Sequence, residues 1–159
     1  MKKVFVVLGM AAVAVSALSP MAQAARPPAR TFVAVMTAAQ EVPTCTAATD
    51  AARGVAVFHV VDEATGTVDY KLIANNLPGD IIAAHIHVAP KGTPGPVVQP
   101  LPPTPGDENG VIAQGTFVNA DLVSAIQADP DGYYVNVHTD VCQPGVIRGQ
   151  LGDHGPLNQ

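Results

Sequence analysis

Short stretches in which apolar and polar residues alternate recur along this chain between residues 31 and 151. Such alternation is typical of β-strands with one buried face, because successive side chains of a strand point to opposite faces. Glycine, proline, asparagine or aspartate falls between most of these stretches, which indicates turns. The pattern predicts strands over residues 31–38, 54–62, 67–74, 81–88, 97–99, 111–118, 133–139 and 146–151.

One stretch departs from this period. Residues 120–128 place apolar side chains at helical spacing, Asn119 can cap the start of a helix there, and the run 129–132 ends it. A single short helix among so many short strands predicts an all-β fold, an antiparallel β-sandwich or barrel. The strands at 54–62 and 67–74 are expected to form a β-hairpin.

The N-terminal segment has a different composition from the rest of the chain. Lysines occupy positions 2 and 3, an apolar run covers residues 4–18, and an Ala-Gln-Ala sequence ends at Ala24. This order predicts a cleavable secretory signal peptide, residues 1–24, because the apolar run is shorter than the roughly 20 residues that span a bilayer. We therefore expect a secreted or periplasmic protein with no membrane span.

The remainder of the chain has the length of one domain. We expect a disordered lead-in over residues 25–30, the domain itself over 31–152 and a tail over 153–159. Residues 89–110 contain seven prolines and form a long loop. A loop of this length in a compact domain favours a functional or covering role.

Charge excludes one class of partner. Without the predicted signal peptide, 6 basic and 13 acidic residues remain, which is a formal charge of −7. Nucleic-acid binding needs a basic surface, so a nucleic-acid partner is not expected.

Two cysteines, Cys45 and Cys142, follow the predicted signal peptide. In an oxidising compartment an even number of cysteines favours a structural disulfide between them. The alternative is that Cys142, four residues after His138, is a thiolate metal ligand.

Three histidines lie on predicted strands. His85 and His87 are two residues apart on one strand, so they share a face with their Cα atoms about 6.6 Å apart. His138 lies on a later strand. Three imidazoles from two strands would suit a transition-metal ion such as copper or zinc. The alternative is that these histidines form hydrogen bonds across the sheet with Tyr134 and Asn136, which share the face of His138.

Other polar residues have more than one interpretation. His59 is expected to be a core or edge histidine, with a role as a fourth ligand as the alternative, and His154 falls in the tail. Arg148 is expected to bind a carboxylate such as Asp140 or Asp80, or alternatively to steer an anion towards the histidines.

Hydrolytic chemistry is not indicated. The sequence contains no Gly-x-Ser-x-Gly motif, and Ser124, the one serine after residue 24, lies in the predicted helix. Asp129 and Asp131 flank a proline and a glycine and are typical of a turn. No catalytic residues are assigned, and a binding protein is expected rather than an enzyme.

Several stretches together resemble the CHRD domain family, which is named after repeats in chordin and also occurs singly in exported bacterial proteins. The matching stretches are Asn76-Leu77-Pro78-Gly79, Ala84-His85-Ile86-His87, Gly95-Pro96-Val97-Val98 with Leu101, Asp131-Gly132-Tyr133-Tyr134-Val135-Asn136-Val137-His138-Thr139 and Pro144-Gly145-Val146-Ile147-Arg148-Gly149-Gln150-Leu151. The resemblance covers residues 31–152 and implies an immunoglobulin-like or superoxide-dismutase-like Greek-key sandwich. Two features depart from the family pattern: Val146 stands where an acidic residue is common, and the proline-rich loop is longer than usual.

A second similarity concerns the histidines alone. A His-x-His strand followed later by a Val-x-Val-His strand is similar to the way in which copper/zinc superoxide dismutases supply copper ligands, which would match His85, His87 and His138. No histidine occurs between residues 88 and 137, so the bridging histidine and the zinc subsite of those enzymes have no counterpart.

These features together predict a non-catalytic module that binds copper, with zinc as the alternative ion, through His85, His87 and His138. One alternative is a metal-free module that binds an extracellular or periplasmic protein partner. A further alternative is a mononuclear copper enzyme of the superoxide dismutase type.

Overall fold

The computed structural model describes residues 28–104 and 109–152. The predicted signal peptide, the start of the lead-in, and the tail with His154 lie outside the described residues. Helix α1 spans Ala120–Ala128, and two 3-10 helices, η1 and η2, span Ala38–Gln40 and Pro130–Gly132. The strands are β1 (Thr31–Thr37), β2 (Arg53–Asp62), β3 (Thr67–Asn75), β4 (Ile81–Val88), β5 (Val97–Pro100), β6 (Gly110–Val118), β7 (Tyr133–Thr139) and β8 (Ile147–Gln150). Each predicted strand and the predicted helix is present, and no end differs from its predicted position by more than one residue.

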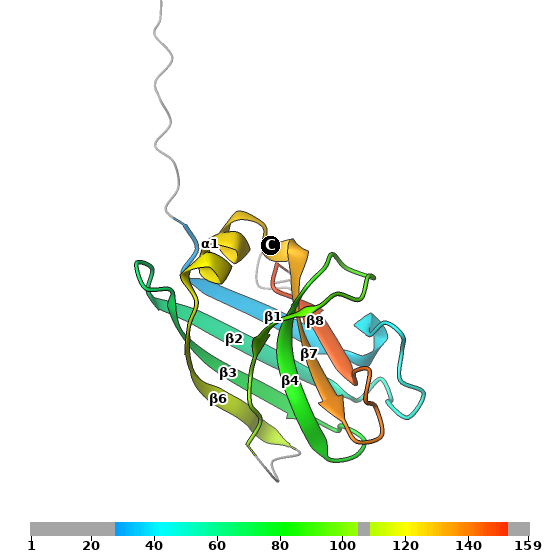
Figure 1. The fold of residues 1–159 in the computed structure, drawn as a ribbon. Coiled ribbons are helices and arrows are strands. Elements are labelled where there is room, and N and C mark those ends of the chain that lie inside the picture. Colours follow the sequence, from blue (N-terminus) through cyan, green and yellow to red (C-terminus); the bar gives the residue numbers. More distant parts are fainter. Residues whose placement is uncertain (1–27, 105–108, 153–159) are drawn as a thin grey trace, which may run out of the picture.

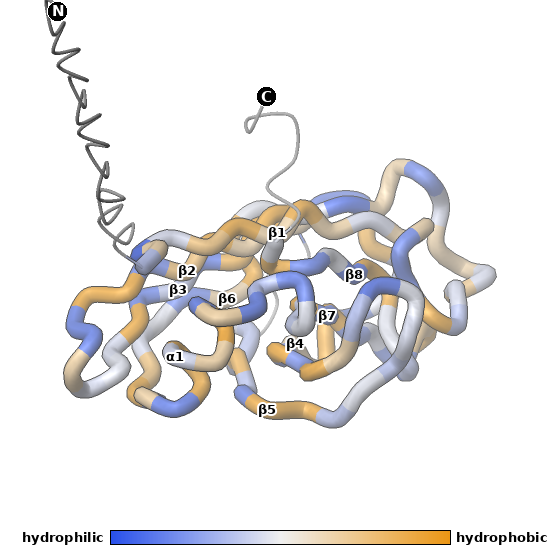
Figure 2. Tube along the Cα trace, turned by 90° about the horizontal axis from the view of Figure 1, so that it is seen from above, coloured by the Kyte–Doolittle hydropathy of each residue, from blue (hydrophilic) through white to orange (hydrophobic). Residues whose placement is uncertain are grey.

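The strands pair throughout as antiparallel neighbours in the order β5-β4-β7-β8-β1-β2-β3-β6. Strands β1 and β8 share a single pair of residues, Thr37 and Arg148, so the sheet bends there into two layers. We call β6-β3-β2-β1 the first layer and β8-β7-β4-β5 the second layer. Figure 2 views the layers from above, with β1 at the top and β5 at the bottom. This arrangement confirms the predicted all-β antiparallel fold.

The hydrophobic core fills the space between the two layers. Alternate side chains of the strands point into it, which is why the alternating pattern is so clear in the sequence. Helix α1 covers the end of this core (Figure 1), and its first turn is capped by Asn119, whose side chain accepts a hydrogen bond from the Leu122 N–H at 3.1 Å. The larger buried side chains are Phe32, Met36, Phe58 and Leu72 of the first layer, Ile86, Val135, Val137 and Ile147 of the second layer, and Leu122, Val123 and Ile126 of α1.

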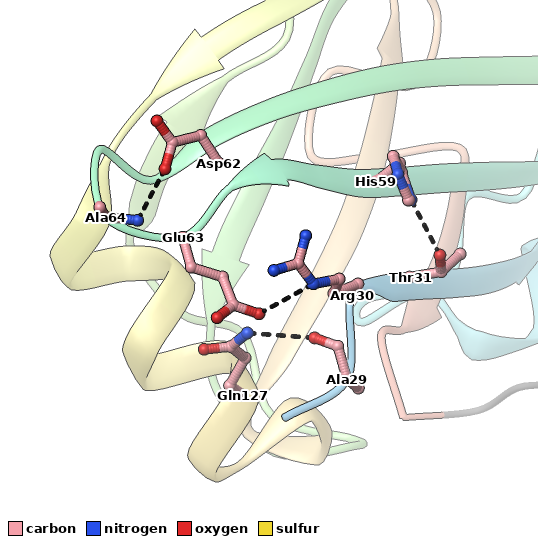
Figure 3. A network of polar contacts seen from close by, with 8 residues as sticks. All are labelled: Ala29, Arg30, Thr31, His59, Asp62, Glu63, Ala64 and Gln127. Atoms are coloured by element: carbon pink, nitrogen blue, oxygen red, sulfur yellow. Dashed lines mark hydrogen bonds and ion pairs between the residues drawn. The ribbon is translucent and has the colours of Figure 1, made fainter. Parts of the chain in front are cut away.

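The last residues of the predicted lead-in contact the domain. The Ala29 carbonyl accepts a hydrogen bond from Gln127 at 3.1 Å, and Arg30 pairs with Glu63 at 3.3 Å, as Figure 3 shows. This part of the lead-in is therefore held between β2 and α1. No helix within the described ranges is long and apolar enough to cross a membrane.

A disulfide joins Cys45 to Cys142 across 97 residues of sequence. It links the loop between η1 and β2 to the turn between β7 and β8. The predicted disulfide is confirmed, and Cys142 is therefore not a thiolate ligand.

Candidate metal centre

The three histidines predicted as ligands lie on one face of the second layer. Strands β4 and β7 are adjacent, and their register places Ala83 opposite His138 and His85 opposite Asn136. Because Ile86 and its alternate neighbours point into the core, His85 and His87 point to the outer face, and so does His138. Strand alternation and the pairing of β4 with β7 thus bring together residues 53 positions apart.

The imidazole nitrogens are close enough to share one ion. One ring nitrogen from each of His85, His87 and His138 lies within 4.8 Å of the others. His85 Nδ1 lies 3.2 Å from His138 Nε2, so a hydrogen bond also connects these two rings. Within the described residues, no other group of three His, Cys, Asp or Glu side chains comes together in this way.

Backbone carbonyls determine which nitrogen carries the lone pair in two of the rings. His87 Nδ1 lies 2.8 Å from the Gly95 carbonyl oxygen, and His138 Nδ1 lies 2.8 Å from the Gln143 carbonyl oxygen. A carbonyl only accepts, so each Nδ1 carries the hydrogen and each Nε2 carries the lone pair. Metal-binding histidines are usually oriented by such a bond from the second ring nitrogen.

The Nε2 atom of His87 is buried and has no hydrogen-bond partner within residues 28–104 and 109–152. The side chain of His87 is only 7% exposed. A buried acceptor without a partner is unfavourable in a folded protein and needs a physical reason. A metal ion held between the three rings would supply the missing partner.

Burial lowers the pKa of all three imidazoles. The pKa of His85 falls to about 4, first because of burial and then because positive charge on His138 and His87 would repel it. Burial also lowers the pKa of His87 and His138, against the opposing effect of the bonds that they donate to carbonyls. All three rings are therefore neutral at neutral pH, which is the form that binds metal.

A loop covers the buried side of this cluster. We call residues 89–96 the strap. Its carbonyl oxygens at Ala89 and Gly95 accept hydrogen bonds from Gln150 Nε2 at 3.0 Å and from His87 Nδ1. Tyr134 also bonds the strap, because its hydroxyl oxygen accepts from the Gly95 N–H at 3.0 Å. These bonds hold the strap against His87, Tyr134 and Gln150. The strap is part of the proline-rich loop for which the sequence predicted a functional or covering role.

Arg148 binds the strap and not the carboxylates that the sequence suggested. Its guanidinium donates to the Thr93 carbonyl at 2.9 Å and to the Pro90 carbonyl at 3.0 Å. Asp140 instead accepts a hydrogen bond from the Asp80 N–H at 2.9 Å. The prediction that Arg148 pairs with a carboxylate was wrong, because carbonyls of the strap accept the hydrogen bonds that its guanidinium would otherwise donate to a carboxylate.

His59 stands apart from the cluster. It is exposed on the outer face of the first layer, where its Nδ1 lies 3.1 Å from the Thr31 hydroxyl (Figure 3). It is therefore neither a core residue nor a fourth ligand of this group.

The model of one protein family, described as the CHRD domain, matches residues 32–151, and these residues contain all three histidines and the strap. The chain belongs to the CHRD domain family. Neither a search of curated proteins nor a search of solved structures found a match for this CHRD domain. Its similarity to copper/zinc superoxide dismutases therefore rests on the histidine pattern alone.

A buried carboxyl group near the histidines of the CHRD domain has no signal in the sequence. Glu41 Oε1 accepts from the Val42 N–H at 3.0 Å and from Asn136 Nδ2 at 3.3 Å. Its Oε2 and the Asn136 Oδ1 have no hydrogen-bond partner in the part of the chain that the structure describes, and both lie against Gly145. Burial raises the pKa of Glu41 to about 7, although its hydrogen bonds and the Arg148 charge act in the opposite direction. Only the packing of η1 against β7 and β8 reveals this group, because Glu41 sits in an ordinary turn sequence.

Proposed function

We propose that this CHRD domain is a non-catalytic module that binds one transition-metal ion, copper in preference to zinc, through His85, His87 and His138. The single observation that carries the proposal is the buried Nε2 of His87, which has no hydrogen-bond partner among the described residues, on a ring with a nitrogen within 4.8 Å of ring nitrogens of two further histidines.

The donor set fits copper and zinc. Neutral imidazole nitrogens suit both ions, and for divalent ions copper binds a given nitrogen site more tightly than zinc. Carbonyls of Gly95 and Gln143 orient two of the rings before any ion arrives, so less ordering is required on binding. In this arrangement the ion would supply the partner that His87 Nε2 lacks and would replace the hydrogen bond between His85 and His138.

Binding is favoured over catalysis by the position of Arg148. A dismutase-type reaction would gain from a cation that attracts an anionic substrate to the metal. Arg148 is only 1% exposed and donates to carbonyls of the strap, so an anionic substrate could not contact its guanidinium. Export is supported by the N-terminal sequence pattern and by the disulfide, which is compatible with an oxidising compartment.

A metal-free protein-interaction module is the second candidate. It is favoured by apolar side chains on the outer face of the first layer, where Val55, Val57 and Ile73 are 38%, 37% and 39% exposed. Apolar residues grouped on a surface are typical of a protein contact.

Titration of Cu(I), Cu(II) and Zn(II) into the metal-free mature protein, residues 25–159, tests the proposal. We expect one ion to bind per chain, and we expect His87→Ala and His138→Ala each to weaken binding by more than about 100-fold, because loss of an orienting partner alone costs about 10- to 100-fold. His59→Ala is the matched control and should bind like the native protein. If no ion binds the native protein more tightly than the two variants, the histidines are structural and the second candidate remains.

The strap provides a further prediction. Gly95→Ala should weaken metal binding about tenfold, because the added Cβ would press on the Val88 carbonyl and displace the carbonyl that orients His87. Gly92→Ala is the matched control within the strap, since its added Cβ meets nothing within 4 Å. The measurement is metal affinity and not stability. Gly92 has a φ of 80°, which favours glycine, so Gly92→Ala lowers the stability of the protein without touching the site. Equal affinities in the two variants would show that the Gly95 carbonyl does not support the site.

A further inference from the structure

A buried positive charge is stacked behind the histidine cluster. The guanidinium carbon of Arg148 lies 3.5 Å from the centre of the Tyr134 ring. The Tyr134 ring in turn lies nearly parallel to the imidazole of His87, with their centres 4.8 Å apart and an angle of 9° between the planes. Arg148, Tyr134 and His87 thus form one continuous stack from β8 across β7 to β4.

Among the described residues, the charge of Arg148 has only neutral hydrogen-bond acceptors. Besides the Pro90 and Thr93 carbonyls, its guanidinium donates to Gln150 Oε1 at 3.0 Å. Tyr134 and then Glu41 are the acidic groups that act on it electrostatically, and burial raises the pKa of Glu41 to about 7, so this carboxyl is partly protonated at neutral pH. The positive charge of Arg148 is therefore only partly compensated by negative charge nearby.

This charge reaches the proposed ligands. Only the Tyr134 ring separates the Arg148 guanidinium from the imidazole of His87. A metal ion bound to His87 Nε2 would be repelled by the guanidinium, in proportion to the charge of the ion. The three ligands are neutral, so they do not offset the charge of the ion.

Resting on the proposed function, we infer that this site selects monovalent copper, Cu(I), over Zn(II) and Cu(II), and that the buried charge of Arg148 produces this selectivity. The donor set acts in the same direction only against Cu(II), which favours tetragonal sites. Three imidazoles with an open fourth position also suit Zn(II), so the charge of Arg148 is what separates Cu(I) from Zn(II).

The size of the effect follows from the stack. Two successive separations of 3.5 and 4.8 Å place the guanidinium near His87, and an ion on Nε2 would lie in the plane of that ring, beside the stack. At about 10 Å and an effective dielectric constant of about 20, each added unit of ion charge weakens binding roughly tenfold. Removing the Arg148 charge should therefore reduce the ratio of the Cu(I) affinity to the Zn(II) affinity about tenfold.

The test compares the affinities of the full exported protein for Cu(I) and Zn(II) by competition with a chromophoric chelator for each ion. We expect Arg148→Met to raise the Zn(II) affinity about tenfold relative to the Cu(I) affinity. Arg148→Lys retains the charge and should stay closer to the native ratio. Arg53→Met, which removes an exposed charge from β2, is the matched control and should leave the ratio unchanged. A ratio that is the same in Arg148→Met and in the native protein overturns the inference.

A measurement on the native protein keeps the inference testable if Arg148→Met does not fold. The bound Cu(II) ion takes up one electron from a mediator to become Cu(I), and the midpoint potential reports the relative affinity for the two ions. We expect a potential more positive than that of copper in excess imidazole, and in Arg148→Met a fall of about 59 mV for a tenfold change in ratio. A native potential at or below that of the imidazole complex overturns the inference. Absence of binding by every ion overturns the proposed function as well, whereas binding without preference for Cu(I) overturns the inference alone.

Discussion

Removal of the Cys45–Cys142 disulfide should lower the free energy of unfolding by about 4 kcal/mol, because the bond closes a long loop of the unfolded chain. The two cysteines are 97 residues apart, so the bridge restricts most of the domain when it is unfolded. The double variant Cys45→Ala, Cys142→Ala, measured by urea unfolding beside the oxidised native protein, tests this value. The variant should unfold at a clearly lower urea concentration.

The same bond also supports the candidate metal centre. Cys142 immediately precedes Gln143, whose carbonyl accepts the hydrogen bond from His138 Nδ1. A reducing agent should destabilise the native protein and leave the double variant unchanged, which is the control for unrelated effects of the reagent. Equal stability of the double variant and the oxidised native protein would show that the unfolded chain gains little freedom when the bridge is absent.

The fold could be read largely from the sequence because its main signal is local. One buried face per strand makes residues such as Phe32, Ala34 and Met36 alternate with more exposed ones, and each strand carries this signal by itself. The order of strands in the sheet has no such local signal. The pairing of β4 with β7 and of β1 with β8 depends on contacts between distant segments, and apart from the β2–β3 hairpin the sequence contained no basis for these pairs.

The candidate site was predictable only where side chains identify it. His85, His87 and His138 stand out by residue type and by alternation. The groups that orient the rings are carbonyls of Gly95 and Gln143, and a backbone carbonyl has no signature in the sequence. The same reason explains the error at Arg148, whose partners are carbonyls of the strap where a carboxylate was expected.

In the metal-free protein, Glu41→Gln should become more stable than the native protein as the pH rises from 5 to 8, by about 2 to 3 kcal/mol. The pKa of Glu41 is raised from 4.5 to about 7, so its contribution to stability is fully present below pH 4.5 and is lost as the pH rises through 7. Glutamine is neutral at every pH, and its amide could donate to the unpaired Asn136 Oδ1. Urea unfolding of both proteins at pH 5 and pH 8 measures the difference.

The histidines change stability in the opposite direction, and the comparison cancels their effect. The pKa of His85 is lowered to about 4, so its contribution is present above pH 6.5 and is lost as the pH falls through 4 in both proteins. Glu63→Gln, which alters a more exposed carboxylate paired with Arg30, is the matched control and should follow the native profile. If the native protein and Glu41→Gln show parallel profiles from pH 5 to pH 8, Glu41 is ionised in the folded protein. Its negative charge would then compensate Arg148, and the preference of the site for a monovalent ion would be weaker.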